Sequence, residues 1–220
     1  MMAIKPHTVS TDQGQRALLT VYLVDDDPAI RDALSLSLSL GGYHTAQFAS
    51  AEDFFSAFDP GWMGCVVADI RMPGMSGLQL QALLAERGSK LPVVIVTGHG
   101  DVASARAAFR GKAIDFLEKP FDGEHLIRAI ETAFEHELGR INQQASQMRR
   151  EAVLSSLSPR EREVMDYLTQ GLHAKEIGEQ MGISHRTVEV HKAHIMEKMG
   201  VRSVIDIMRL TEGAPAQKIV

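Results

Sequence analysis

Five reactive or charge-bearing side chains in this sequence each follow a short apolar run, where a buried strand would end. These side chains are Asp25, Asp26, Asp69, Thr97 and Lys119. Parallel strands place their carboxyl ends at one edge of a sheet, so these groups are expected to converge. Carboxylates that cluster repel one another, and a divalent cation with oxygen ligands, Mg2+ (or Mn2+), would remove that conflict. The lysine and the hydroxyl would then hold phosphoryl oxygens while Asp69 attacks phosphorus.

Each of these residues also has a simpler interpretation. Asp25 and Asp26 would suit the acidic start of a helix, Thr97 a turn, and Lys119 a solvated surface. The placement of all of them at strand ends favours a shared site over these separate explanations.

The elements that would position this site alternate along the chain. Apolar runs at 20–24, 44–48, 65–68, 91–96 and 114–117 alternate with five helical patterns. This order predicts an α/β doubly wound, five-stranded parallel sheet. Beyond Leu157 every pattern is helical, with capping serines and terminating glycines, which predicts an all-α four-helix domain containing a helix-turn-helix.

The domain organisation follows from these patterns. The predicted segments are an N-terminal tail at 1–19, the sheet domain at 20–138, a linker expected to be helical at 139–153, the helical domain at 154–213 and a C-terminal tail at 214–220.

Composition narrows the class of protein. The chain has 220 residues, 23% of them charged, a formal net charge of -5 and one cysteine, Cys65, so an internal disulfide is excluded. No segment approaches the length of a membrane span, and residues 1–20 lack a signal-peptide core. We therefore expect a cytoplasmic protein without a membrane partner.

The sheet domain resembles the CheY-like receiver domain of two-component response regulators. The matching motifs are Val24-Asp25-Asp26-Asp27, Asp69 to Gly77, Thr97 to Asp101 and Asp115 to Phe121. The resemblance implies that Asp69 accepts a phosphoryl group from a histidine kinase and that Lys119-Pro120 is a cis peptide bond.

The resemblance also implies roles for the surrounding residues. Asp26, Asp69 and the Arg71 carbonyl would bind Mg2+ directly, and Asp25 would act through a water. Thr97 and Lys119 would hold phosphoryl oxygens. Phe116 matches the aromatic switch position whose side chain follows Thr97.

Two positions depart from the family pattern. Lys112 stands where the family usually has glycine, so either Lys112 adopts a strained positive φ or the helix ends one residue earlier. Ser76 stands where the family often has Asp, and we expect it to cap a helix equally well.

In the helical domain, residues at spacings of three and four divide the third helix into two faces. Val188, His191, Ile195 and Met199 should pack inward, with His191 packing and hydrogen bonding rather than binding a metal. The candidate DNA contacts are Lys175, Arg186, Thr187, Glu189, Val190, Lys192, Ala193 and His194. Residues 154–220 have no net formal charge, and this would also fit a helical interaction module that does not bind DNA.

The helical domain resembles the LuxR-type (FixJ/NarL) helix-turn-helix. The matching segments are Leu157 to Glu161, Gly171-Leu172, Lys175 to Ile177, Ile183-Ser184, Thr187-Val188, Val190-His191 and Lys198 to Ser203. The whole chain thus resembles a two-component response regulator of the FixJ/NarL type.

The resemblance implies a phosphorylation-dependent DNA-binding transcription regulator and not an enzyme with a separate substrate. Its partners would be a sensor histidine kinase, promoter DNA, a second copy of the chain after phosphorylation and RNA polymerase. A phosphohydrolase with an Asp nucleophile is disfavoured, because Arg71 stands where its general acid would be. The hypothesis of a dinucleotide-binding enzyme has still less support. The remaining alternative is a DNA-binding protein whose receiver is never phosphorylated.

Overall fold

The computed structural model describes residues 16–98 and 100–212. The predicted C-terminal tail at 214–220, most of the N-terminal tail at 1–19, and His99 lie outside the described residues. The chain divides into two compact units, residues 1–141 and 142–220. No helix in the described part of the chain is long and apolar enough to cross a membrane.

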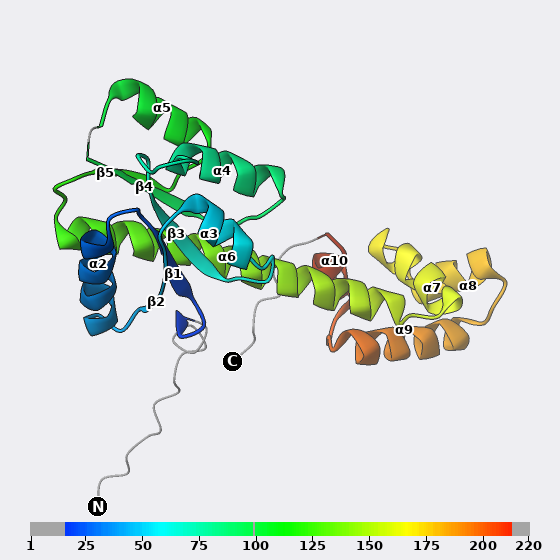
Figure 1. Ribbon diagram of the computed structural model, residues 1–220. Helices are drawn as coiled ribbons and strands as arrows, with labels where there is room; N and C mark the ends of the chain where they lie inside the picture. Colours follow the sequence, from blue (N-terminus) through cyan, green and yellow to red (C-terminus); the bar gives the residue numbers. More distant parts are fainter. Residues whose placement is uncertain (1–15, 99, 213–220) are drawn as a thin grey trace, which may run out of the picture. The chain divides into compact units, whose positions relative to one another are not determined.

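The first unit is built on one five-stranded parallel sheet of order β2-β1-β3-β4-β5 (Figure 1). The strands are β1 Thr20–Val24, β2 His44–Phe48, β3 Gly64–Asp69, β4 Val93–Thr97 and β5 Asp115–Glu118. Val24 pairs with Ala68 and Asp69 with Val96, so the carboxyl ends of β1, β3 and β4 lie level at one edge. The predicted doubly wound parallel sheet is confirmed.

Helices cover both faces of this sheet. They are α2 Pro28–Leu40, α3 Ala51–Ala57, α4 Gly77–Glu86, α5 Val102–Arg110 and α6 Gly123–Ser155. In β3, Cys65 and Val67 join a core with α2 and α6, whereas Val66 and Ala68 join a core with α3, α4 and α5. Successive side chains of β3 point to opposite faces of the sheet. Because both faces are buried, they contribute to two separate cores.

Local sequence explains where these helices begin. Asp27 accepts a hydrogen bond from the backbone N–H of Ala29, and Ser50 and Asp101 cap α3 and α5 in the same manner. Ser76 forms a complete capping box with Gln79, so the helix start tolerates serine in place of the family's usual aspartate, as predicted.

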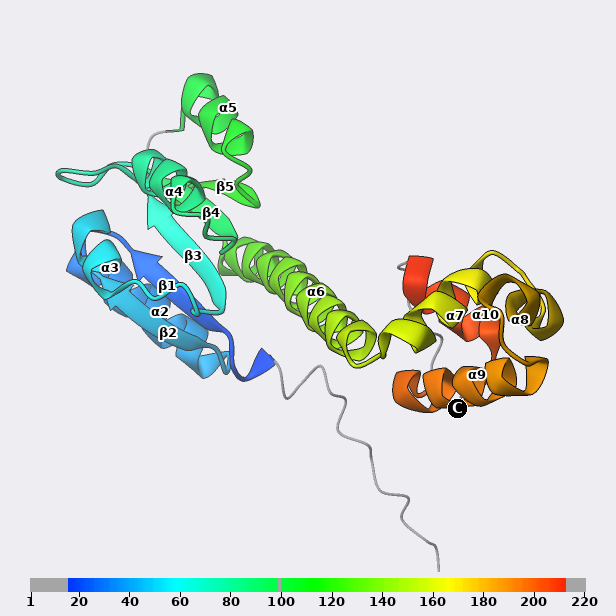
Figure 2. The ribbon, with the colours of Figure 1, turned by 90° about the vertical axis from the view of Figure 1, so that its right-hand side faces the viewer.

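The helix α6 continues through residues 139–153, the segment predicted as a linker (Figure 2). Its first half buries an apolar stripe that includes Leu126, Ile130 and Phe134 against the sheet. Glu137 on the same half is fully buried, and both of its oxygens accept hydrogen bonds at 2.7 Å from the guanidinium of Arg140. A buried carboxylate requires such a partner because it has lost its hydration.

The turn after α5 explains the departure at Lys112. Lys112 adopts φ +65°, the only positive φ among the described residues other than glycine. Gly111 before it lies so close to α4 that a Cβ there would be 2.5 Å from the Gln81 side chain. Gln81 is buried and donates a hydrogen bond to the Ala108 carbonyl, so it cannot easily move. Glycine at position 111 is therefore required for steric reasons, and the positive φ of the turn falls on Lys112.

Replacing Lys112 with glycine should stabilise the first unit by about 0.5–1 kcal/mol, because glycine adopts the left-handed region without a Cβ clash. Denaturation followed through the fluorescence of Trp62, the single tryptophan, reports on this unit. Lys90→Gly is the matched control, since Lys90 is exposed and has no positive φ, and it should give no gain. An equal gain in both variants would contradict strain at Lys112.

The second unit packs four helices beyond α6 around a common core. They are α7 Pro159–Thr169, α8 Ala174–Met181, α9 His185–Met199 and α10 Val204–Glu212, and the predicted all-α domain is confirmed. Its core includes Val164, Ile177, Val188, Ile195 and Ile207. Gly182 ends α8 with φ +66° and so allows the tight turn into α9.

Candidate functional site

The carboxyl ends of β1 and β3 bring three carboxylates together. Asp25, Asp26 and Asp69 each offer an oxygen, and these atoms all lie within 4.8 Å of one another. Asp25 and Asp69 are buried, whereas Asp26 is exposed at the rim. The predicted convergence of these three residues is thus present in the structure.

Lys119 supplies the positive charge in this cluster. Its ammonium lies 2.6 Å from an oxygen of Asp25 and 2.7 Å from an oxygen of Asp69. Burial alone would lower the pKa of Lys119, but the hydrogen bonds to Asp25 and Asp69 outweigh it and the pKa is raised. The lysine is therefore charged at neutral pH and offsets part of the repulsion between the carboxylates. The peptide bond between Lys119 and Pro120 is cis, as predicted.

Backbone groups orient the two buried carboxylates. Asp69 accepts a hydrogen bond at 3.1 Å from the N–H of Arg71, and Asp25 accepts one at 2.9 Å from the N–H of Asp27. With the lysine bonds these contacts occupy both oxygens of each carboxylate. The predicted role of the Arg71 carbonyl as a metal ligand is untested and stays a prediction.

The loop after β3 is held by Glu52 of α3, a residue that the sequence reading missed. Glu52 accepts a hydrogen bond at 2.9 Å from the N–H of Met75. Gly74 has φ +76°, and a Cβ there would lie 2.7 Å from the Glu52 carboxylate. The positive φ favours glycine at this position, and the hydrogen bond to Glu52 anchors the loop that carries Arg71.

The two predicted switch residues lie on neighbouring strands. Thr97 ends β4 and is fully buried, and Phe116 in the middle of β5 is half-buried. Their strands are paired, with Ile95 opposite Phe116 and Thr97 opposite Glu118. Glu118 also accepts a hydrogen bond at 3.0 Å from the N–H of Gly100, so it ties the loop after Thr97 to the end of β5.

The chemistry of this cluster suits a hard divalent cation. Mg2+ prefers carboxylate and water oxygens and is usually held by one or two carboxylates. The exposed Asp26 leaves the cluster open toward solvent, and Asp25 and Asp69 present their oxygens within the spacing that one ion can bridge. These residues fit the predicted Mg2+ or Mn2+.

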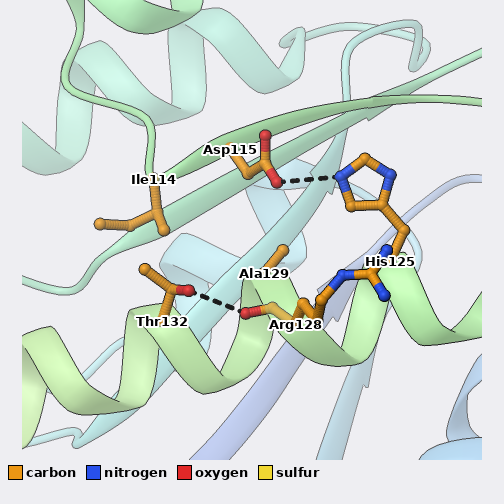
Figure 3. Close-up of a pocket in the computed structure, with 6 residues that line it drawn as sticks. All are labelled: Ile114, Asp115, His125, Arg128, Ala129 and Thr132. Carbon is orange, nitrogen blue, oxygen red and sulfur yellow. Dashed lines mark hydrogen bonds and ion pairs between the residues drawn. The ribbon is translucent and has the colours of Figure 1, made fainter.

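A small cavity of about 130 Å³ lies elsewhere, between β5 and α6 (Figure 3). The Nε2 atom of His125 lies 3.3 Å from a carboxylate oxygen of Asp115 at this cavity. The rest of the lining is formed by Ile114, Arg128, Ala129 and Thr132. It contains none of the predicted phosphoacceptor residues. It is a polar depression on the β5–α6 face rather than part of the acidic site.

In the second unit, the structure confirms the predicted division of α9 into two faces. Val188, Ile195 and Met199 are buried, and His191 is half-buried. All eight candidate DNA contacts are exposed except Lys192, which is half-buried and lies 3.4 Å from Glu189. The hydroxyl of Thr187 is already bonded to Ser184 at 2.8 Å, within the cap of α9.

His191 differs from its prediction in one respect. It packs inward as expected, but its Nδ1 atom is buried without a hydrogen-bond partner among the described residues. The hydrogen bonding expected of His191 is therefore not found at this nitrogen among the described residues.

An ion pair that the sequence reading missed joins the start of α7 to the end of α9. Glu161 closes the capping box with Ser158 and accepts a hydrogen bond at 2.6 Å from the ammonium of Lys198. The hydrogen bond from Lys198, together with the backbone N–H of Ser158, lowers the pKa of Glu161 to about 2. Lys198 also donates to the Ser156 carbonyl at 3.2 Å, which fixes α9 to the segment before α7.

Replacing Lys198 with Met should lower the melting temperature of the second unit by about 5 °C at pH 7, which corresponds to about 1 kcal/mol. The pKa of folded Glu161 lies below its unfolded value, so the contribution is present above about pH 4.5 and is lost as the pH falls toward 2. The gap between wild type and variant in thermal melts should therefore close over that range. Arg160→Met, which breaks an exposed pair with Glu163, is the control. A gap that stays constant with pH would contradict the coupling.

Comparison with protein families finds two matches that together span most of the chain. Residues 21–131 match the response regulator receiver domain, and residues 155–211 match the bacterial regulatory proteins of the luxR family. Receiver domains typically bind Mg2+, in agreement with the acidic cluster.

Individual proteins resemble the chain over nearly its whole length. The transcriptional regulatory protein FixJ of Bradyrhizobium diazoefficiens is 40% identical, with 86% of this chain and 93% of that protein covered. The structure of the response regulator StyR superimposes with a TM-score of 0.82 at 38% identity, covering 88% of this chain and 98% of StyR. Full-length FixJ from B. japonicum gives a TM-score of 0.55 at 41% identity, covering 88% and 95%.

Proposed function

This chain belongs to the response regulators that join a receiver domain to a LuxR-type helix-turn-helix, and we propose that Asp69 carries its phosphoryl group. Such a protein is a phosphorylation-dependent transcription regulator whose partners are a sensor kinase and DNA. The observation that supports Asp69 is the convergence of Asp25, Asp26, Asp69 and Lys119 at one edge of the sheet.

In the proposed transfer, an oxygen of Asp69 attacks the phosphorus of a phosphohistidine on the kinase. The new O–P bond forms as the P–N bond breaks, and the electron pair leaves with the imidazole nitrogen. Lys119 and Thr97 would then hold phosphoryl oxygens, and Lys119 needs only to exchange its bond to Asp69 for one to the phosphoryl group. A Mg2+ ion held by Asp26 and Asp69, by Asp25 through a water and by the Arg71 carbonyl would supply the charge that offsets the transferred group.

The switch that we propose couples Asp69 to a surface. Thr97 would move toward the phosphoryl group and Phe116 would follow it. The face formed by α5, β5 and α6 would change and pair with the same face of a second copy. Apolar side chains that are exposed on these helices include Val102 and Phe109 of α5 and Ile127 of α6.

The proposed DNA interface is the exposed face of α8 and α9. Lys175, Arg186, Thr187 and Lys192 would contact phosphates, and Glu189, Val190, Ala193 and His194 would lie toward the base edges. Dimerisation would place two such helices on two half-sites, and binding would tighten because the second contact becomes intramolecular. RNA polymerase is the further partner expected at a promoter.

A phosphohydrolase remains disfavoured as an alternative. Its mechanism needs an acid two residues after the nucleophile, and that residue is Arg71. The relatives are transcriptional regulators, in agreement with a chain that has no substrate besides its own Asp69. In our proposal the receiver assists only the phosphorylation and dephosphorylation of Asp69.

The proposal is tested by measuring mass, elution volume and DNA affinity before and after treatment with acetyl phosphate and Mg2+. We expect a shift from monomer to dimer and tighter binding to promoter DNA. Affinity should fall steeply with salt, with a log–log slope of about 0.9 for each phosphate contacted. A mass and an affinity that do not change while Asp69 is phosphorylated would favour a DNA binder that works without phosphorylation.

A further inference from the structure

The first three turns of α9 present an unusual set of side chains for a helix that enters DNA. Val188 and Ile195 are buried, and they fix which side of α9 faces outward. Glu189, Val190 and Ala193 are exposed on that outer side. Ala193 follows Val190 by three positions and Glu189 by four, so the three residues share one face. None of these three residues is a cation.

The carboxylate of Glu189 can only accept hydrogen bonds, and this restricts its partners in the major groove. Guanine presents two acceptors there, N7 and O6, and would repel it. Adenine offers the N6 donor but carries the N7 acceptor on the same base, whereas cytosine offers the N4 donor and carries no acceptor of its own in this groove. Among the four bases, cytosine therefore suits Glu189 best.

Neighbouring residues reduce the cost of bringing a carboxylate near phosphates. The ammonium of Lys192 lies 3.4 Å from the Glu189 carboxylate, and Arg186 lies one turn earlier on the helix. Val190 is 49% exposed beside Glu189 and has no polar atom in its side chain. Its methyl groups suit the C5-methyl group of thymine, the one apolar feature that a base presents in the major groove.

We propose that α9 selects its half-site through a cytosine read by Glu189 and a nearby thymine whose methyl group contacts Val190. This inference rests on the proposed DNA-binding function. It adds the base classes that the helix recognises and names Glu189 as the residue that determines specificity by excluding guanine.

The test is selection from a randomised duplex library by the full-length chain treated with acetyl phosphate and Mg2+, at fixed salt. The wild type should enrich a motif with one cytosine position per half-site, preferred over guanine by about five-fold or more. Glu189→Gln should move the preference at that position toward adenine, and Glu189→Lys toward guanine, while the other positions stay the same. Val190→Ala should weaken a thymine preference at a different position.

Arg186→Ala is the matched control, because a lost phosphate contact should weaken binding to all sequences and reduce the salt slope by about one without changing the motif. A motif that is the same in wild type and Glu189→Lys would overturn the readout while leaving DNA binding intact. Failure of the wild type to bind any duplex would instead overturn the proposed function itself. Since Glu189 is exposed, thermal melts of its variants should match those of the wild type.

Discussion

Asp69→Asn should reduce the incorporation of a labelled phosphoryl group from a small phosphodonor to background, a fall of more than about 100-fold. Asparagine keeps the shape of the side chain, but its amide is a poor nucleophile and lacks the negative charge that pairs with Lys119. The measurement is the labelled fraction after a fixed time with Mg2+, together with the loss of the label in hydroxylamine, which cleaves acyl phosphates.

Asp53→Asn is the matched control, because Asp53 is an exposed aspartate on α3 outside the cluster of three carboxylates. It should be labelled as fast as the wild type. Labelling of Asp69→Asn at the wild-type rate would show that another residue accepts the group, and the function of the acidic cluster would have to be explained differently.

Arg140→Met should lower the free energy of unfolding of the first unit by about 3 kcal/mol. The variant leaves the fully buried carboxylate of Glu137 without the guanidinium that donates to both of its oxygens. We place the effect at the lower end of the range for broken buried pairs because the Arg140 side chain is 30% exposed. Denaturant titration followed through Trp62 measures it, since the indole stacks on Tyr22 in the same unit.

Arg128→Met on the same helix is the control, because Arg128 and Glu124 form an exposed pair 3.7 Å apart and should contribute less than about 0.5 kcal/mol. Combining Arg140→Met with Glu137→Met should recover much of the loss, since two apolar side chains need no counter-charge. Equal losses in Arg140→Met and Arg128→Met would show that burial of Glu137 contributes little.

The sequence by itself was sufficient for the architecture and for the members of the acidic cluster. The strands at 20–24 and 44–48 have the predicted bounds, and Asp69 ends a strand with all its residues buried. These features are local: an apolar run, a capping residue or a terminating glycine acts within a few positions along the chain. Because parallel strands end at one edge, the order of elements was enough to predict that Asp25, Asp26 and Asp69 would meet.

Only the tertiary structure decided which charged groups pair and which are buried. Lys119 bonds both Asp25 and Asp69, residues 94 and 50 positions away, and Lys198 reaches Glu161 across 37 positions. Sequence periodicity also gave no sign that Glu137 is buried with Arg140 as its partner, or that Gly111 is required by Gln81. Such contacts depend on the order of the strands, the direction of each side chain and the space between helices, and no pattern along the chain encodes these directly.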